Sequence, residues 1–419
     1  MSATDHILAA PAIPPEASAH VRQGNMADGR PNAPFKVALV HDWLCAMRGG
    51  EKCLEVACGR FRNAELFTLF HVLGTTSPTI DQMRIHTSRL QRLPDVSRYY
   101  RYLLPLMPRA IEGLRMPHDV DLVLSFSHAV AKAVRPPAGV PHVCYCFTPM
   151  RYAWEMRGEY FGDHANGRAR AIRCLNSPIG MARDAVLDRL QEWDRVTSDR
   201  VTHFVACSQT VARRIAECYG RSSVVIHPPV DTRFYTPAEV RRDDYYLCVS
   251  ALVPYKRIDL AVEACRRLGR RLVVIGTGPL ERRLREPASN VATFLGWRTN
   301  REIREHLRRC RALLFPAHED FGIVPVEANS CGAPVVALGR GGATETILPA
   351  DENQIGTGVF FTEPTVDRLC EAIRWLEANL DRLNPQLARR RALCFRQERF
   401  ERRLVAYVEQ VACLSAQAR

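Results

Sequence analysis

Residues 312–329 read ALLFPAHEDFGIVPVEAN, and this stretch predicts one strand–loop–helix unit. The segment ALLFP is a short apolar run, typical of a buried strand. Gly322 and Pro325 resist a continuous helix, and we expect Pro325 at the first position of a new one. Glu319 then lies in the loop, and Glu327 lies in the first helical turn, where the dipole favours a carboxylate. The two glutamates therefore belong to different local structures.

The same unit recurs along the whole chain. After a proline-rich connection, strand-like runs lead into the loops SALVPYKRID (250–259), GTGP (276–279), FLGW (294–297) and GRGG (339–342). N-terminal to that connection, the run FKVALVH (35–41) precedes a Gly-Gly turn and a helix. Later strand-like runs there are VDLVLSFS (120–127), VPHVCYCF (140–147) and VTHFVACS (201–208). Such alternation predicts α/β architecture with two doubly wound domains in tandem. Ligands of these folds bind beyond the carboxyl ends of the strands.

Four segments make up the expected domain organisation. They are a disordered leader at 1–34, a first α/β domain at 35–235, a second at 236–385, and a C-terminal helical segment at 386–419 that packs back on the first domain. The leader lacks a basic start followed by an apolar core, so we do not expect a signal peptide.

Composition narrows the class of protein. A chain of 419 residues is too long for one ordinary hydrophobic core, so two domains are expected. The 15 cysteines include no CxxC pair, which favours reduced buried thiols in a cytoplasmic protein over a zinc site. The net charge of +13 favours anionic partners, and no apolar run is long enough to span a membrane. Only four of the 58 basic residues are lysines, so each lysine carries extra information.

Two loops have the composition of phosphate-binding sites. In RGGEK (48–52), Gly49 and Gly50 allow the backbone to approach a ligand and offer N–H groups to an anion, although a simple tight turn also explains them. In residues 250–259, Lys256 and Arg257 precede a helix and suit a diphosphate, with a solvated basic turn as the alternative.

The opening stretch adds a third such loop. Backbone N–H groups from Phe321 through Gly322 and Ile323 to Val324 are available to a phosphate, and both glutamates can accept hydrogen bonds from sugar hydroxyls. For Glu327 the alternative is a surface side chain that only compensates the helix dipole. The loop that contains Glu345 fits a phosphate or sugar in the same way.

These motifs, in this order, resemble the retaining glycosyltransferases of family four, which have the GT-B fold of two Rossmann-like domains facing across a cleft. The resemblance runs from Lys36 to the C-terminus, and its most specific part is the spacing of Glu319 and Glu327 around a Phe-Gly pair. The segments HDWL, RGGEK, SHAVAK and TPMRYAW are similar to a branch of mannosyltransferases that build lipid-linked bacterial polysaccharides.

The resemblance implies specific roles in donor binding. Lys256 binds the diphosphate, Glu319 contacts the transferred hexose, and Glu327 holds the ribose. The amides of Phe321 to Val324 face the sugar and the distal phosphate. Other implied donor contacts are Gly49 and Gly50 from the opposite domain, Arg257, Gly276, and Gly296 with Trp297 beside the base. No metal or cofactor is expected, and retention is explained by front-face attack without a carboxylate nucleophile.

Two positions depart from the family pattern. Ala251 stands where many members have an arginine, and Arg257 is the expected substitute. Phe147 stands where many members have a histidine that contacts the donor sugar. His128 follows another strand, and we expect it to join Glu319 and Lys256 in catalysis, with a buried structural histidine as the alternative.

The acceptor side is expected in the first domain. Arg151, Tyr152 and Trp154 follow a strand and are candidates for its lining, although a core tryptophan is an equal alternative. Residues 84–115 contain seven arginines with tyrosines and leucines, which fits an interface with an anionic membrane surface. A long helical hairpin with exposed arginines is the alternative.

The predicted function is transfer of a hexose, mannose from GDP-mannose, to a glycan acceptor linked to polyprenyl diphosphate at the cytoplasmic face of the inner membrane. The alternatives are a UDP-sugar donor, an epimerase on the same fold, and a non-catalytic protein that binds sugar nucleotides. A basic nucleic-acid-binding protein fits the charge, but the chain has no nucleic-acid motif.

Overall fold

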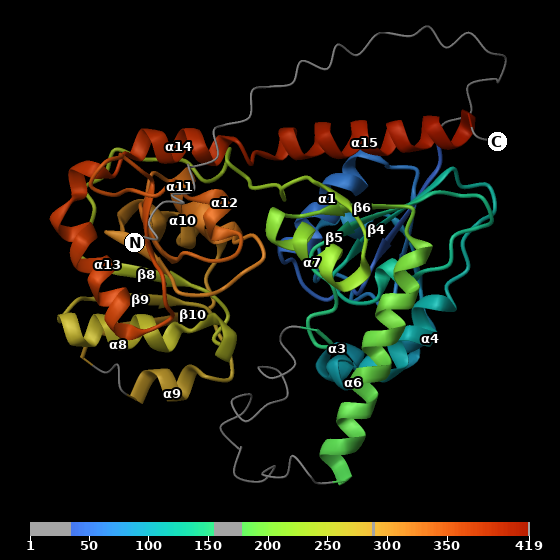
Figure 1. Cartoon of the computed structure of the whole chain (residues 1–419), viewed down its shortest axis with the longest axis horizontal. Coiled ribbons are helices and arrows are strands. Elements are labelled where there is room, and N and C mark those ends of the chain that lie inside the picture. The colour runs from blue at the N-terminus through green and yellow to red at the C-terminus, as the bar shows by residue number, and fades with distance from the viewer. Residues whose placement is uncertain (1–34, 155–177, 287–289, 418–419) are drawn as a thin grey trace, which may run out of the picture. The chain divides into compact units, whose positions relative to one another are not determined.

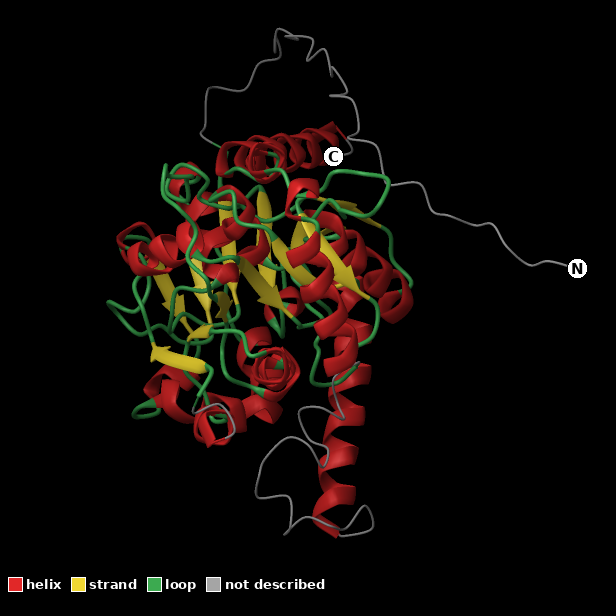
Figure 2. Cartoon of the chain, turned by 90° about the vertical axis from the view of Figure 1, so that its left-hand side faces the viewer, coloured by secondary structure: helices red, strands yellow, loops and turns green. Residues whose placement is uncertain are grey.

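The computed structural model describes residues 35–154, 178–286 and 290–417, and Lys36–Arg419 form one compact unit (Figure 1). The predicted leader at 1–34 lies outside the described residues. Two sheets make up the framework, and every described strand pair in both is parallel. Figure 2 shows the strands, in yellow, with helices, in red, on either side. The predicted α/β class is confirmed.

The first sheet has seven strands in the order β3-β2-β1-β4-β5-β6-β7. Their bounds are β1 Val37–His41, β2 Glu65–Thr68, β3 Arg84–Thr87, β4 Leu122–Ser127, β5 His142–Cys146, β6 His203–Ala206 and β7 Ser223–Val225. The strand order reverses between β1 and β4, and in doubly wound sheets ligands bind beyond the carboxyl ends at that point.

Helices and 3-10 turns cover both faces of this sheet. Their bounds are α1 Gly49–Arg60, α2 Pro78–Asp81, η1 Arg89–Arg92, α3 Val96–Tyr99, η2 Tyr100–Leu106, α4 Met107–Glu112, η3 Ala131–Ala133, α6 Pro178–Thr197, η4 Ser198–Arg200 and α7 Gln209–Tyr219. Along β1, Val37 and Leu39 join the apolar cluster of α1 and α7, whereas Ala38 and Val40 join that of α4 and α6. The strand therefore has a core on each side, as its unbroken apolar run predicts.

The second sheet repeats this plan with six strands in the order β10-β9-β8-β11-β12-β13. Their bounds are β8 Tyr246–Val249, β9 Leu272–Ile275, β10 Ala292–Gly296, β11 Ala312–Phe315, β12 Val335–Leu338 and β13 Gly358–Phe361. The order reverses between β8 and β11. The loops after these two strands contain Lys256 and Glu319, so the topology brings them to one edge.

The helices of the second sheet also cover both faces. Their bounds are η5 Pro254–Lys256, α8 Ile258–Leu268, α9 Glu281–Arg285, α10 Asn300–Arg309, α11 Ile323–Ser330, α12 Ala343–Thr346, α13 Val366–Ala378 and η7 Leu380–Arg382. Tyr246 and Cys248 pack with α8 and α13, whereas Leu247 packs with α10 and α11. Both cores are built from alternate residues of the same strands.

The C-terminal segment divides its contacts between the two cores. Helix α14 (Pro385–Leu393) packs beside α11, and Ala392 shares an apolar cluster with Val326. Helix α15 (Gln397–Gln417) instead places Leu404 and Val408 in the cluster that contains Leu39 of β1. Within the residues that the structure describes, no helix is long and apolar enough to cross a membrane.

The arginine-rich stretch 84–115 is built from short elements. It does not form the long helical hairpin that was the alternative, but β3 followed by η1, α3, η2 and α4. Pro94, Pro105 and Pro108 explain the short elements, because proline interrupts the helical hydrogen-bond ladder. The core of this region comes from Val96, Met107 and other apolar side chains, while all seven arginines are exposed.

Candidate active site

The loop after β11 carries the opening motif. Gly322 has φ +81° and is the N-cap of α11, so the helix begins at Ile323, before the proline. Pro325 is therefore the third helical residue and not the first, and Glu327 lies in the second turn and not the first. Proline is tolerated there because the first N–H groups of a helix have no intrahelical acceptor. The same property leaves amides of the α11 N-terminus available to an anion.

Lys256 and Glu319 form the clearest pair in this region. Lys256 ends η5 after β8, Glu319 follows β11, and the Nζ of the lysine forms an ion pair with the Oε1 of the glutamate. Their side chains are 16% and 22% exposed, so both remain accessible to a ligand. The structure thus brings together the two residues that sequence reasoning assigned to the donor diphosphate and the hexose.

Glu327 is nearly buried, and its ion-pair partner comes from helix α1, which packs on the first sheet. Lys52 Nζ in α1 lies 3.2 Å from Glu327 Oε1, and the exposed fractions are 30% for the lysine and 6% for the glutamate. Burial, and then the charge of Glu327, raise the pKa of Tyr235 well above its ordinary value. Glu327 is therefore not a surface residue that only compensates the dipole.

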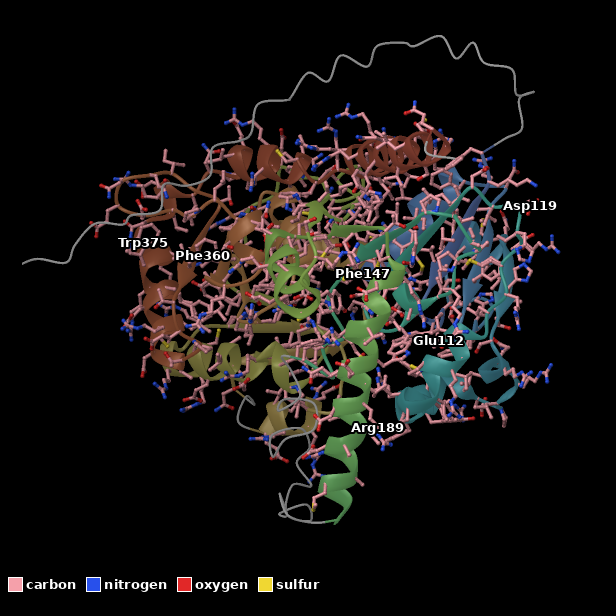
Figure 3. The ribbon with its side chains drawn as sticks, turned by 45° about the vertical axis from the view of Figure 1, so that its right-hand side comes forward. Glu112, Asp119, Phe147, Arg189, Phe360 and Trp375 are labelled. Atoms are coloured by element: carbon pink, nitrogen blue, oxygen red, sulfur yellow. The ribbon has the colours of Figure 1, made fainter. Side chains whose placement is uncertain are left out.

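Gly49 and Gly50 lie where the backbone of α1 comes close to Ile323 and Phe147. A Cβ built on Gly49 would lie 2.9 Å from Ile323 Cδ1, and one built on Gly50 would lie 3.2 Å from Phe147 Cε2. Phe147, labelled in Figure 3, follows β5. The N-terminus of α1 thus lies against the N-terminus of α11, and a side chain at Gly49 would require Ile323 to move.

The other predicted glycines and Arg257 differ in their surroundings. A Cβ on Gly276, at φ +132°, would lie 1.9 Å from the Ser250 carbonyl oxygen, so this position requires glycine. Gly296 has open space around it, and Trp297 beside it is 72% exposed. Arg257 extends toward Asp259, with Nε 3.2 Å from Oδ1, and not toward Lys256.

Asp320 is the residue of this loop that sequence reasoning missed. It lies between Glu319 and Phe321 with its side chain 11% exposed, and Arg151 and Arg214 both form ion pairs with its carboxylate. Arg151, a candidate for the acceptor side, thus contacts the loop that carries Glu319. An acidic residue in a turn is common, so only its position next to Glu319 could have singled out Asp320.

Glu345 also has a defined partner. It accepts hydrogen bonds from the backbone N–H groups of Gln209 (2.8 Å) and Thr210 (3.1 Å) at the start of α7, and His227 Nε2 lies 3.1 Å away. Burial opposes ionisation, but His227 and the two N–H groups outweigh it and hold the pKa of Glu345 below its ordinary value. This carboxylate caps a helix.

His128 lies just after β4 and is held by a buried carboxylate. Asp42 Oδ2 lies 2.8 Å from His128 Nδ1, and the histidine side chain is 29% exposed. Tyr152 lies near this pair: burial, and then Tyr100 and Asp42, raise its pKa to about 12. Sequence reasoning identified His128 and Tyr152 but gave no role to Asp42, which lies in the HDWL segment directly after a buried strand.

Trp154 belongs to a buried polar cluster. Its Nε1–H donates to Asp194 Oδ2 at 2.9 Å, and Tyr219 donates to the same oxygen at 2.7 Å. Lys132, 1% exposed, lies 3.1 Å from Asp194 Oδ1. The structure therefore places the Trp154 indole N–H in the interior, in accordance with the core alternative.

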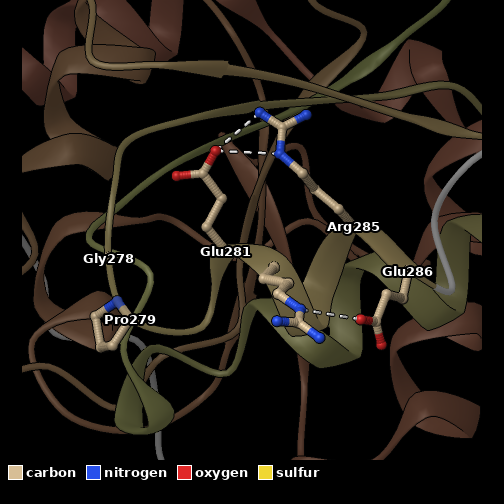
Figure 4. Close-up of a pocket in the computed structure, with 6 residues that line it drawn as sticks. Gly278, Pro279, Glu281, Arg285 and Glu286 are labelled. Carbon is tan, nitrogen blue, oxygen red and sulfur yellow. Dashed lines mark hydrogen bonds and ion pairs between the residues drawn. The ribbon is translucent and has the colours of Figure 1, made fainter.

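An open depression lies on the second half of the chain. It has a volume of about 640 Å³ and is lined by Gly278, Pro279, Glu281, Arg282, Arg285 and Glu286 (Figure 4). Arg285 pairs with Glu281 and Arg282 with Glu286, so its charged groups are already satisfied (Figure 4). None of the predicted donor residues lines it. Within the described residues, no group of three or more His, Cys, Asp or Glu could hold a metal ion.

Comparison with known proteins adds the family. A family model described as Glycosyltransferase Family 4 matches residues 68–234, and one described as Glycosyl transferases group 1 matches residues 234–390. Anabaena HepE, solved with UDP and glucose, has a TM-score of 0.64 at 17% identity over 89% of this chain and 99% of that chain. Sucrose-phosphate synthase from Thermosynechococcus elongatus has a TM-score of 0.65 at 14% identity over 91% of this chain and 100% of that one.

The fold and the paired strand-end loops define a GT-B protein with two Rossmann-like sheets. Within that class, the chain belongs to the glycosyltransferases of family four. A GDP-mannose-dependent alpha-(1-6)-phosphatidylinositol monomannoside mannosyltransferase of Mycolicibacterium smegmatis is 31% identical over 197 residues, which are 40% of this chain and 50% of that protein. A GDP-mannose-dependent monoacylated alpha-(1-6)-phosphatidylinositol monomannoside mannosyltransferase of Corynebacterium glutamicum is 30% identical over 197 residues, again 40% of this chain and 50% of that protein. The chain spans about half the length of these curated relatives.

Proposed function

We propose that this chain transfers mannose from GDP-mannose, with retention at the anomeric carbon, to a glycan acceptor linked to polyprenyl diphosphate. The observation that carries the proposal is the pairing of Lys256 with Glu319 beside the N-terminus of α11. A cation, a carboxylate and free helix amides suit, in turn, the diphosphate, the hydroxyls and the distal phosphate of a nucleotide sugar. The similar mannosyltransferases of Mycolicibacterium smegmatis and Corynebacterium glutamicum are named as GDP-mannose-dependent, which supports the choice of mannose and GDP.

In this proposal each donor residue has one task. Lys256 neutralises the leaving diphosphate, and in the free chain its ion pair with Glu319 keeps both side chains in place. Glu319 accepts hydrogen bonds from the hexose. Glu327 accepts them from the ribose, which then competes with Lys52 for the carboxylate. The leaving phosphate stays close to the anomeric carbon, so no carboxylate nucleophile and no metal ion is required.

We place the lipid end of the acceptor at the arginine-rich stretch 84–115. Arg89, Arg92, Arg109 and Arg115 are exposed, and among the described residues none of them forms an ion pair. Tyr102 is 85% exposed and Leu106 is 51% exposed in the same stretch. Unpaired cations beside apolar side chains are suited to anionic lipid headgroups, each basic residue contributing about 1 kcal/mol at the surface. The chain would then work at the surface of the inner membrane.

Sedimentation with vesicles tests this placement. We expect the chain to sediment with phosphatidylglycerol vesicles and not with phosphatidylcholine vesicles. The double variant Arg89→Glu/Arg92→Glu should weaken that binding, whereas Arg282→Glu, an exposed arginine on α9, should not. Equal binding of both vesicle types by the wild-type chain would argue against an electrostatic membrane contact.

Thermal denaturation with a panel of nucleotide sugars tests the donor. A ligand present at about 100 times its Kd stabilises the folded state by about 2.7 kcal/mol. We expect GDP-mannose to raise the Tm of the wild-type chain and to lose this effect in Lys256→Ala. Lys36→Ala is the matched control, because Lys36 pairs with Asp119 on the surface, away from any predicted donor residue. A rise in Tm with UDP-sugars alone would show that the donor is a UDP-sugar and not GDP-mannose. An unchanged Tm with every nucleotide sugar would contradict the proposed function.

A non-catalytic protein that binds sugar nucleotides is the second candidate. The observation in its favour is that Ala251 supplies no cation and Arg257 is directed to Asp259, so Lys256 stands without the expected arginine. Turnover by the purified chain that is lost in both Lys256→Ala and Glu319→Ala excludes this candidate. Donor binding without turnover under any acceptor condition would favour it.

A further inference from the structure

Asp42 is the most heavily bonded carboxylate at the edge where β1 and β4 end. It is fully buried and accepts four backbone N–H groups, from His128 (2.7 Å), Ala129 (3.1 Å), Val130 (2.6 Å) and Ala131 (2.7 Å). These bonds fix the turn that leads from β4 into η3. They also keep the carboxylate ionised, since burial opposes its charge but His128 and the N–H donors outweigh it and lower the pKa of Asp42.

The same carboxylate orients the His128 ring. Oδ2 lies 2.8 Å from Nδ1, and Trp43 packs edge-on to the ring with centroids 4.7 Å apart. Nε2 has no hydrogen-bond partner among the described residues, and the side chain is 29% exposed. The ring is thus held at Nδ1, while Nε2 is not engaged by another described residue. Neutral His128 with its proton on Nδ1 presents a lone pair at Nε2.

His142 provides the comparison within the same sheet. It is fully buried at the start of β5 and bonds only to neutral groups, with Ser125 Oγ 2.8 Å from its Nε2. Burial therefore lowers the pKa of His142 to about 3, as for a structural histidine. Burial lowers that of His128 as well, but Asp42 outweighs it, and the pKa of His128 is raised. A histidine that only fills a core does not need a buried carboxylate.

The position of His128 relates it to the proposed donor loop, residues 319–324 after β11. Its ring centroid lies 6.4 Å from that of Phe147, the first residue after the adjacent strand β5. Phe147 borders Gly50, and the neighbouring Gly49 borders Ile323 at the start of α11. The imidazole therefore lies at the strand-end edge where the Gly-Gly turn meets the donor loop.

We propose that Asp42 is a positioning residue and His128 the catalytic base, whose Nε2 accepts the proton of the acceptor hydroxyl. This assignment rests on the proposed transfer of a hexose. The acceptor O–H bond breaks and its oxygen bonds to the anomeric carbon. The bond from that carbon to the diphosphate breaks, and its electron pair leaves with the nucleoside diphosphate. The proton on Nε2 then passes to water.

His128→Gln tests the base. With GDP-mannose and a synthetic mannosyl polyprenyl diphosphate, we expect kcat to fall about 100-fold, the usual range for a lost general base, with the Kd for GDP-mannose unchanged. His71→Gln is the matched control, because His71 Nε2 also lies 2.8 Å from a carboxylate, that of Asp81, outside the β1–β4 edge. A His128→Gln variant with kcat within threefold of wild type would overturn the assignment.

Asp42→Asn separates positioning from mere support of the turn. The charged groups that face His128 are Asp42, Glu51 and Arg48, and the His41 ring lies 6.2 Å away. The wild-type rate should rise with pH as His128 loses its proton. Without the Asp42 charge, this limb should move to lower pH while kcat falls. A fall in kcat with an unmoved limb would mean that Asp42 only supports the turn.

Nitrogen NMR of the wild-type chain keeps the assignment testable if a variant fails to fold. We expect neutral His128 to carry its proton on Nδ1, and a proton on Nε2 would overturn the assignment. A wild-type chain that transfers no sugar from any nucleotide sugar would remove the proposed function and this base together. An active wild type with an unaffected His128→Gln variant would remove the base alone.

Discussion

Asp320→Asn is the substitution that tests most sharply how the proposed donor loop is held. The carboxylate of Asp320 forms ion pairs with Arg151 and Arg214, and the three side chains are 11%, 18% and 9% exposed. Asparagine has nearly the same volume, so the substitution removes the charge without opening a cavity. Both guanidinium groups then stay in the interior without this carboxylate.

The expected cost follows from the burial of the three groups. Two unit charges about 4 Å apart attract by about 4 kcal/mol at an effective dielectric constant near 20, and the desolvation of the carboxylate offsets part of this. Removing one partner of a buried pair costs about 3–5 kcal/mol. At about 2 cal/mol/K per residue, the unit Lys36–Arg419 unfolds with an entropy of about 0.8 kcal/mol/K, so Tm should fall by about 4–6 °C.

Calorimetry of Asp320→Asn beside Asp259→Asn measures this difference. Asp259 also pairs with an arginine, Arg257, but its side chain is 52% exposed, and an exposed pair contributes at most about 1 kcal/mol. We expect the control to keep the wild-type Tm within about 1 °C. Because Glu319 is the adjacent residue, Asp320→Asn should also raise the Kd for GDP-mannose. Equal Tm values for the two variants would refute the reasoning.

Two further predictions concern the same loops. A Cβ on Gly342 would lie 2.2 Å from Phe321 Cα, so Gly342→Ala should destabilise the chain by about 1–3 kcal/mol or more in urea unfolding. A Cβ on Gly59 in α1 would have nothing closer than 4.0 Å, so Gly59→Ala should stabilise the chain by about 0.5–1 kcal/mol. A Gly342→Ala variant more stable than Gly59→Ala would contradict the packing. The pKa of Glu345 is lowered from its ordinary 4.5, so the ionised side chain stabilises the folded state above that pH, and this stabilisation is lost as pH falls through the folded-state pKa. Glu345→Gln should therefore lower the free energy of unfolding at pH 7 and make that free energy fall less steeply below about pH 5. An unchanged acid dependence would count against the contact with His227.

Most of the strands could be predicted because they are unbroken apolar runs. Strands β1, β4 and β11 are buried on both faces, and such runs have few alternatives in a soluble chain. Strands β3, β7 and β13 were missed, because RIHT is largely polar, SVV has only three residues and GVFF is a four-residue run that begins with glycine, so none gives a clear period. Pairing with a neighbouring strand, and not local preference, makes these edge segments extended.

The candidate site could be predicted as far as its loops but not as far as its partners. The spacing of Glu319 and Glu327 singled out the loop after β11, whereas the helix start was wrong by two residues, because Gly322 allows the turn to close before Pro325. The partners of these loops come from distant parts of the chain. Lys52 meets Glu327, and Asp42 meets His128, across separations that no local pattern encodes. Sequence reasoning could therefore name reactive side chains but not the contacts that orient them.

The central claim is that Lys256 and Glu319 bind a nucleotide sugar for transfer, and kcat/KM of Lys256→Ala tests it most directly. The assay follows the release of GDP from GDP-mannose with a synthetic mannosyl polyprenyl diphosphate as acceptor, and compares Lys256→Ala with Lys36→Ala. Removing one preorganised stabilising group from an active site typically costs about 100-fold or more. The account predicts a loss of at least that size in Lys256→Ala and wild-type activity in Lys36→Ala. Equal kcat/KM for the two variants would contradict it.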